Sequence, residues 1–226
     1  MSAAAKIISL LWASNANRLF DALLNDIAPQ LLAMQGISAV QMNLDDTAVA
    51  MAAAKKIQNQ WPLCQALCSF VSESEQSSSM AIGLLQSAGE KMSYFNVDFT
   101  EPLPARVVVS GQRSPGFSQI AFIARAPQLS HGDWLNYWRN QHTAIAIETQ
   151  STWRYVQNCL HAGEGSFDAI VEECFPAAAM TDDQAFYDAV GDEDLCRSRQ
   201  HKMLESCSRF IDFSRIAVLP TSEYRF

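Results

Sequence analysis

The histidine at position 142 is the side chain in this sequence that is best suited to moving a proton. An imidazole has an ordinary pKa near 6.5, so it can act as an acid or a base close to neutral pH. If it is buried it must find a partner or stay neutral, because ionisation in a low-dielectric site is costly. Helical spacing predicts one face with Trp134, Trp138, Gln141, His142, Ile145 and Thr149, and an opposite face with Asn136, Arg139, Asn140 and Thr143. The pattern fits a catalytic histidine and equally a structural core histidine.

A strand predicted over residues 152–161 follows this helix and carries further polar side chains. Side chains alternate across a strand, so one face carries Tyr155, Gln157 and His161 and the other carries Arg154 and Asn158. The first face offers a phenol, an amide and an imidazole, and the second offers donors for a carbonyl or an oxyanion. The sequence leaves open which face lines a pocket. The aromatic residues of the strand also fit simple packing against helices.

The elements that would position these groups occur in the same order twice. In the first half we expect strands at 6–13, 37–44, 64–71 and 94–99, and helices at 17–32, 47–58 and 80–88. In the second half we expect strands at 117–125, 152–161, 167–175 and 213–219, a helix capped by Ser130, and helices within 181–209. A Pro/Gly-rich break separates the halves. The predicted units are residues 1–104 and 116–226, joined by a linker at 105–115 with a possible extra strand at 107–110.

The helix and strand of the second half resemble the EthD family. The segment from Trp138 to His142 reads WRNQH and the segment from Arg154 to Asn158 reads RYVQN, and the likeness extends from Gly116 to Pro220. The resemblance implies an α+β fold with tandem ferredoxin-like (βαββαβ) units that form an intramolecular dimeric α+β barrel, with a pocket between sheet and helices. Thr143 and Ala144 stand where the family has a small residue and a proline, so we expect the helix to continue past His142.

The first half is interpreted as a degenerate second copy of the same unit. Its alignment places Ile27-Ala28-Pro29 opposite His142-Thr143-Ala144, and Val40-Gln41 opposite Val156-Gln157. An aliphatic residue therefore replaces the histidine. Since an aliphatic side chain cannot transfer a proton, the first copy is predicted to be a scaffold filled with side chains.

The resemblance implies an enzyme that acts on a small apolar or aromatic molecule without metal, nucleotide or other cofactor. His142 would be its acid or base in an oxidoreductase of monooxygenase-like type, an isomerase or a dehydratase. Substrate would contact Trp134, Trp138, Arg154, Tyr155, Gln157, Asn158 and His161. One alternative is a non-catalytic barrel that binds a small molecule or a protein partner, and another is a haem-binding variant with His142 as axial ligand.

Composition limits the partners of the chain. Its 16 basic and 24 acidic residues give a net charge of −8, which disfavours nucleic acid and anionic membrane surfaces. The sequence has no apolar run of about 18 residues that could span a bilayer, and residues 7–13 fit a first strand better than a leader peptide. Six scattered cysteines predict buried thiols in a reducing compartment, the cytoplasm. Exposed sheet or helix faces leave a homo-oligomer possible.

Overall fold

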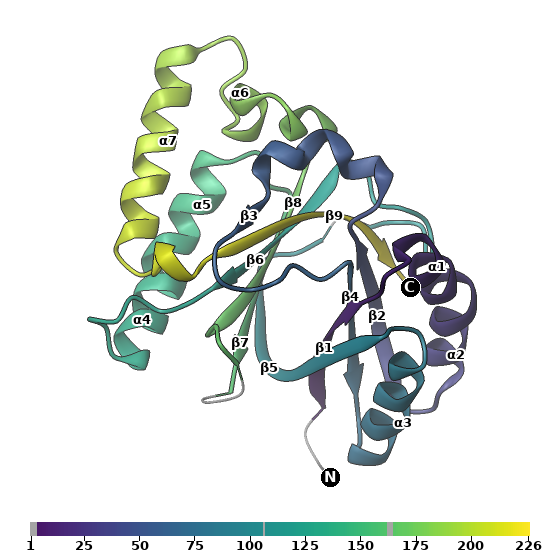
Figure 1. The fold of residues 1–226 in the computed structure, drawn as a ribbon. Coiled ribbons are helices and arrows are strands. Elements are labelled where there is room, and N and C mark those ends of the chain that lie inside the picture. The colour runs from purple at the N-terminus through teal and green to yellow at the C-terminus, as the bar shows by residue number, and fades with distance from the viewer. Residues whose placement is uncertain (1–3, 106, 162–164) are drawn as a thin grey trace.

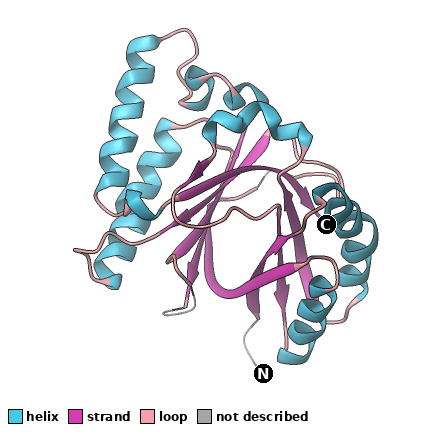
Figure 2. Cartoon of the chain, viewed as in Figure 1, coloured by secondary structure: helices cyan, strands magenta, loops and turns pink. Residues whose placement is uncertain are grey.

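The computed structural model describes residues 4–105, 107–161 and 165–226, which form an antiparallel barrel with helices outside it (Figures 1 and 2). The strand order in these residues is β2-β4-β1-β5-β7-β8-β6-β9, with β3 added on β9. The barrel closes because β9 also pairs with β2. Helices α1, α2 and α3 cover one side of the barrel, and α4, α5 and α7 cover the opposite side (Figure 1).

The first unit contains four barrel strands and one short edge strand. Its strands are β1 (Ala5–Trp12), β2 (Ile37–Leu44), β3 (Ile57–Gln58), β4 (Ala66–Ser72) and β5 (Lys91–Leu103). Its helical segments are α1 (Ala16–Ala22), the π-helical turn η1 (Leu23–Ile27), α2 (Ala28–Ala33), the 3-10 helix η2 (Thr47–Lys55) and α3 (Glu75–Gln86). Asn15 caps α1 and Ser74 caps α3 through their side-chain oxygens.

The second unit repeats this order. Its strands are β6 (Phe117–Ile123), β7 (Arg154–Leu160), β8 (Ala169–Phe175) and β9 (Ala217–Arg225). Its helical segments are α4 (His131–Tyr137), the π-helical turn η3 (Trp138–His142), α5 (Thr143–Thr149), η4 (Ala177–Met180), α6 (Asp183–Phe186), α7 (Glu193–Ser208) and η5 (Phe213–Arg215). The two units join through β5–β7 and β9–β2, so the predicted tandem α+β barrel is confirmed.

Several element predictions are wrong in place or type. The helix expected at 80–88 is α3, which begins at Glu75, and the helix expected at 47–58 is a 3-10 helix followed by the short strand β3. Residues 107–110 lie in no strand, and Val107 and Val109 are exposed. β-branched residues favour a strand only where they can pack on a sheet face, and none is available there. The last strand begins at Ala217 because Asp212 caps the short helix η5 and holds Phe213 to Arg215 out of the sheet.

A π-helical turn interrupts the long helix of each unit at the same place. The backbone N–H of Thr143 donates to the carbonyl of Trp138, and that of Ala28 donates to the carbonyl of Leu23. Each turn adds one residue to the helical repeat and rotates the following face. The predicted faces are therefore wrong at two positions, since Gln141 is exposed and Thr143 is buried. As expected, the backbone stays helical past His142.

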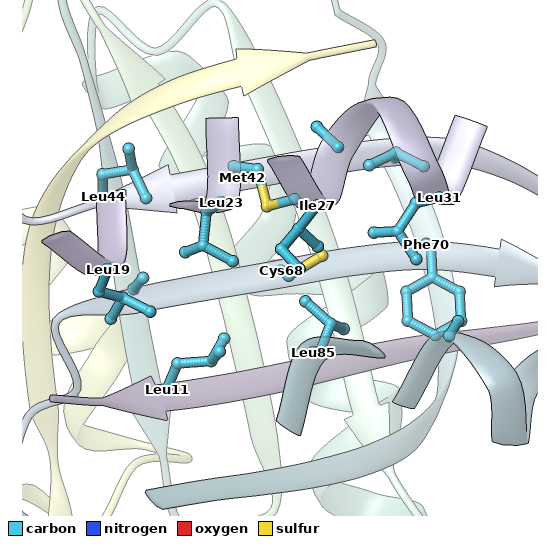
Figure 3. Packing of buried hydrophobic residues seen from close by; sticks show 14 of the residues in the cluster. Leu11, Leu19, Leu23, Ile27, Leu31, Met42, Leu44, Cys68, Phe70 and Leu85 are labelled. Carbon is cyan, nitrogen blue, oxygen red and sulfur yellow. The ribbon is translucent and has the colours of Figure 1, made fainter. Parts of the chain in front are cut away.

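Four apolar clusters follow from this arrangement among the described residues, and the fourth packs Phe175 and Phe186 of the second unit against Val49 of η2. The first lies between the helices and the sheet of the first unit, where Leu23 and Ile27 pack toward Met42 and Cys68 (Figure 3). The second fills one end of the barrel lumen, around Phe122 and Leu160. The third lies between helices and sheet in the second unit, around Trp138. All six cysteines are free, and all but Cys207 are buried.

We expect Gly116→Ala to destabilise the barrel more than Gly191→Ala does. Both glycines have a positive φ, +79° and +82°, so each alanine brings strain of about 1–2 kcal/mol. A Cβ at Gly116 would also lie 1.9 Å from the carbonyl oxygen of Phe175, at the start of the β6–β8 ladder, whereas Gly191 has open space. Urea unfolding of the two variants measures which one loses more stability. Equal losses in the two variants would show that the β6–β8 contact does not matter.

Candidate functional site

His142 lies in the closed layer between α5, α7 and the sheet. Its side chain is buried, its Nδ1 is 2.9 Å from the Ser206 hydroxyl, and its ring centre is 4.5 Å from that of Phe210. Burial lowers the pKa of His142 to about 4, so the ring is neutral at pH 7. Ser206 Oγ is also 3.2 Å from the Tyr137 hydroxyl, which forms a chain of three polar groups. The geometry permits proton transfer along this chain.

The helix-facing residues of β7 are tied to the helix above them. Trp138 Nε1 donates to the Tyr155 hydroxyl at 2.9 Å, and Gln157 Nε2 donates to Thr143 Oγ1 at 2.9 Å. Burial raises the pKa of Tyr155, which keeps the phenol neutral. Trp134 packs on Trp138 and is fully buried. These side chains are brought together around His142, and they pack on one another.

His161 is a predicted site residue that the fold separates from this layer. It follows the end of β7, its side chain is half exposed, and its Nε2 is 3.5 Å from Asp98 Oδ1. Alternation alone placed it on the face of Tyr155 and Gln157. The strand ends at Leu160, so the alternation does not extend to position 161.

Arg154 and Asn158 point to the other face of β7, into the barrel lumen. Arg154 Nη1 lies 3.2 Å from Glu172 Oε2 and 2.7 Å from Glu223 Oε2, and Asn158 Nδ2 donates to Glu172 Oε1 at 2.9 Å. Lys6 Nζ completes the cluster at 2.9 Å from Glu172 Oε1. Sequence reasoning missed Lys6, Glu172 and Glu223. The available signal was Lys6 and the Glu172-Glu173 pair inside the mainly apolar strands β1 and β8.

The buried charges of this lumen cluster compensate one another. Burial alone would raise the pKa of Glu172, but Lys6 and Arg154 hold it well below its usual range. Burial alone would lower the pKa of Arg154, but Glu172 and Glu223 raise it instead. Glu172 and Arg154 are therefore both charged at pH 7.

The lumen cluster also corrects the alignment of the two copies. Gln41 Nε2 donates to Glu172 in the lumen at 2.7 Å, whereas Gln157 donates to Thr143 in the helix layer. Because side chains alternate, Gln41 cannot correspond to Gln157, and the strand alignment is wrong by one residue. The helix alignment of Ile27 with His142 agrees with the two π-helical turns, which end at these residues.

Glu173 is a buried carboxyl on the helix-facing side of β8. Tyr155 is the residue paired with it on the neighbouring strand β7. Gln119 Nε2 donates to Glu173 Oε2 at 3.4 Å. Burial raises the pKa of Glu173 to about 7, and the contact with Gln119 lowers it only in part. Sequence reasoning missed this residue because its partners come from two other strands, β6 and β7.

An apolar cavity of about 480 Å³ opens at the apolar end of the barrel lumen. Ring centres of Trp61, Phe95 and Phe122 lie 5.1–5.4 Å from that of Phe167, which forms an aromatic wall. Trp12 completes the lining, and its Nε1 donates to the carbonyl of Leu63 at 3.1 Å. The lining does not include His142 or the other predicted site residues. No signal in the sequence joined these aromatic residues, because they come from separate strands and loops.

The surroundings of His142 do not fit a haem. Phe210 covers the imidazole, Ser206 holds its Nδ1, and the layer around it is filled by Trp138 and Tyr155. A porphyrin would have to displace these side chains. Among the described residues, no group of three His, Cys, Asp or Glu side chains is placed to hold a metal ion. No helix of the described chain is long and apolar enough to cross a membrane.

Neither a protein-family model nor a curated protein matches this sequence. Solved structures do share its fold. An anthrone oxidase-like protein aligns with 99% of this chain and 94% of its own, at a TM-score of 0.57 and 7% identity. A candidate monooxygenase from Fusobacterium nucleatum subsp. nucleatum aligns with 96% of this chain and 91% of its own, at a TM-score of 0.55 and 8% identity. A chlorite dismutase variant from Candidatus Nitrospira defluvii aligns with 97% of this chain and 90% of its own, at a TM-score of 0.51 and 8% identity.

We expect His142→Gln and Glu173→Gln to change the pH dependence of stability in opposite directions. His142 has a pKa of 6.5 unfolded and about 4 folded, so in wild type it makes the free energy of unfolding fall as pH falls. Glu173 has a pKa of 4.5 in the unfolded chain and about 7 in the folded protein, so it makes the free energy of unfolding fall as pH rises. Each effect is at most roughly 3 kcal/mol.

Urea unfolding between about pH 4.5 and 6.5 measures both effects. Relative to wild type, His142→Gln should lose stability as pH rises, and Glu173→Gln should gain it. The exposed His201 is the matched control, and His201→Gln should follow the wild-type profile. Parallel profiles for all four proteins would show that neither group is perturbed in the fold.

Proposed function

We propose that this protein binds one small apolar or aromatic molecule in the apolar cavity at the end of the barrel. The observation that carries this proposal is the aromatic wall of Trp61, Phe95, Phe122 and Phe167 around a volume of about 480 Å³. Ligand pockets typically have volumes of about 300–1,000 Å³ and mainly apolar linings. The buried Cys64 thiol does not act as a nucleophile here, since burial raises its pKa to about 12.

Polar groups at the rim of the cavity would orient the ligand. Lys91 Nζ lies 4.9 Å from the ring centre of Trp12, and Gln86 and Ser93 also line the opening. A ligand with an apolar body and one polar substituent would place the body against the aromatic wall and the substituent at the rim. The first unit supplies Trp12 and Phe95 and the second supplies Phe122 and Phe167, so both halves are required for the site.

Binding is tested with N-phenyl-1-naphthylamine, a neutral aromatic probe whose fluorescence rises in apolar sites. We expect saturable binding with one site per chain, and roughly tenfold weaker binding in Trp61→Ala because an aromatic contact and its buried area are lost. Leu204→Ala is the control, because Leu204 is exposed on α7 and distant from the lining. Unchanged affinity in Trp61→Ala, or two equivalent sites, would contradict the proposal.

A second candidate function is oxidation of an apolar substrate without metal or nucleotide, with His142 as the base. The chain of Tyr137, Ser206 and His142 supports it, because a neutral imidazole can accept a proton and pass it on. The names of two fold neighbours, an anthrone oxidase-like protein and a candidate monooxygenase, point to the same chemistry. The base would equally serve an isomerisation or a dehydration. Since His142 is buried, the α5–α7 layer must open for substrate to reach it.

Oxygen consumption with anthrone as probe substrate tests this second function. We expect His142→Gln to lose at least about a hundredfold in rate, as for removal of a general base, while urea unfolding at pH 7 still shows a folded protein. His201→Gln, which changes an exposed histidine, should keep the wild-type rate. An absence of oxygen uptake in wild type, or an unchanged rate in His142→Gln, would refute this role of His142.

A further inference from the structure

A second cavity, of about 310 Å³, opens at the opposite end of the barrel lumen. The inward side chains of β1 show this arrangement, because Lys6 lines the second cavity, Ile8 lies in the middle, and Leu10 and Trp12 line the apolar one. The second cavity is lined by charged side chains and by two rings, from Phe99 and Phe226. The two ends of one lumen therefore present different chemistry.

Charges of alternating sign run into this second cavity. Lys6 pairs with Glu172, Glu172 with Arg154, Arg154 with Glu223, and Glu223 Oε1 lies 3.1 Å from Arg225 Nε. The cluster thus holds three cations and two buried carboxylates among the described residues. The balancing negative charge is Glu101, whose Oε1 lies 3.0 Å from Arg154 Nε and whose side chain is 35% exposed at the mouth.

A contribution to fold stability alone does not account for this buried charge cluster. Removing charges from water costs free energy that their mutual attraction often fails to recover, and apolar residues of similar volume frequently stabilise more. The other half of the same lumen is packed with such residues, including Phe122, Leu160 and Leu219. Charges kept in one half, beside an open cavity, indicate recognition of a charged ligand.

We propose that this second cavity binds a small carboxylate with an aromatic or aliphatic body. The carboxylate would take the place of Glu101 at the Nε side of Arg154, in a cavity that Lys6 also lines, because a guanidinium fork matches a carboxylate and an ammonium adds a point charge. The body would lie against Phe99 and Phe226. In the free protein Glu101 occupies the place of the ligand carboxylate beside Arg154, so it competes with the ligand.

Calorimetric titration with benzoate tests this site, with neutral benzyl alcohol of similar size as the matched ligand. We expect benzoate to bind, more weakly at high salt, and benzyl alcohol not to displace it from this cavity. Glu101→Gln should tighten benzoate binding roughly threefold to tenfold, because the competing carboxylate is removed while the position stays polar. Phe226→Ala should weaken binding.

Two control variants separate this site from surface effects and from the apolar cavity. Glu148→Gln removes a more exposed carboxylate, which is paired with Lys202 on the outside of the protein, and should leave benzoate affinity unchanged. Trp61→Ala, in the apolar cavity, should also leave it unchanged. The proposal is overturned if benzoate does not bind, if benzyl alcohol displaces benzoate equally well, or if Glu101→Gln fails to tighten binding.

Discussion

The pairing of β5 with β7 and of β9 with β2 is the constraint on which the rest of this structure depends. Without these two seams, each unit would expose two strand edges with unpaired backbone groups. With them, the described barrel strands all have a neighbour on both sides. Closure also brings together side chains that no single unit holds, such as Gln41 of the first unit and Glu172 of the second.

Closure divides the protein into a lumen and two outer layers with different roles. In each outer layer a helix containing a π-helical turn packs on the sheet, with Leu23 and Ile27 in one layer and Trp138 and His142 in the other. Because the turn also occurs where every buried side chain is aliphatic, it belongs to the architecture and not to a reaction of the histidine. Open space lies at the two ends of the lumen, where strands from both units meet.

The site expected from the sequence and the cavities in the structure therefore differ in position. Tyr155, Gln157 and the two tryptophans of the helix lie with His142 in one packed layer. Arg154 was expected to hold a substrate oxygen, and it holds Glu172 and Glu223 at the charged end of the lumen. It is the one predicted site residue that lines a described cavity.

The sequence alone determined the order of elements and the cap of α4 at Ser130, because period, capping residues and turn residues act over a few positions. It also determined that His142 would face the core.

The tertiary structure alone decided which face of β7 meets the helices, the one-residue shift between Gln41 and Gln157, and the burial of Thr143. Strand register and a π-helical turn each move side chains by one position, and local patterns do not record such shifts. The lumen clusters lay beyond the sequence for the same reason, since Lys6 and Glu172 are 166 residues apart and meet only when the barrel closes.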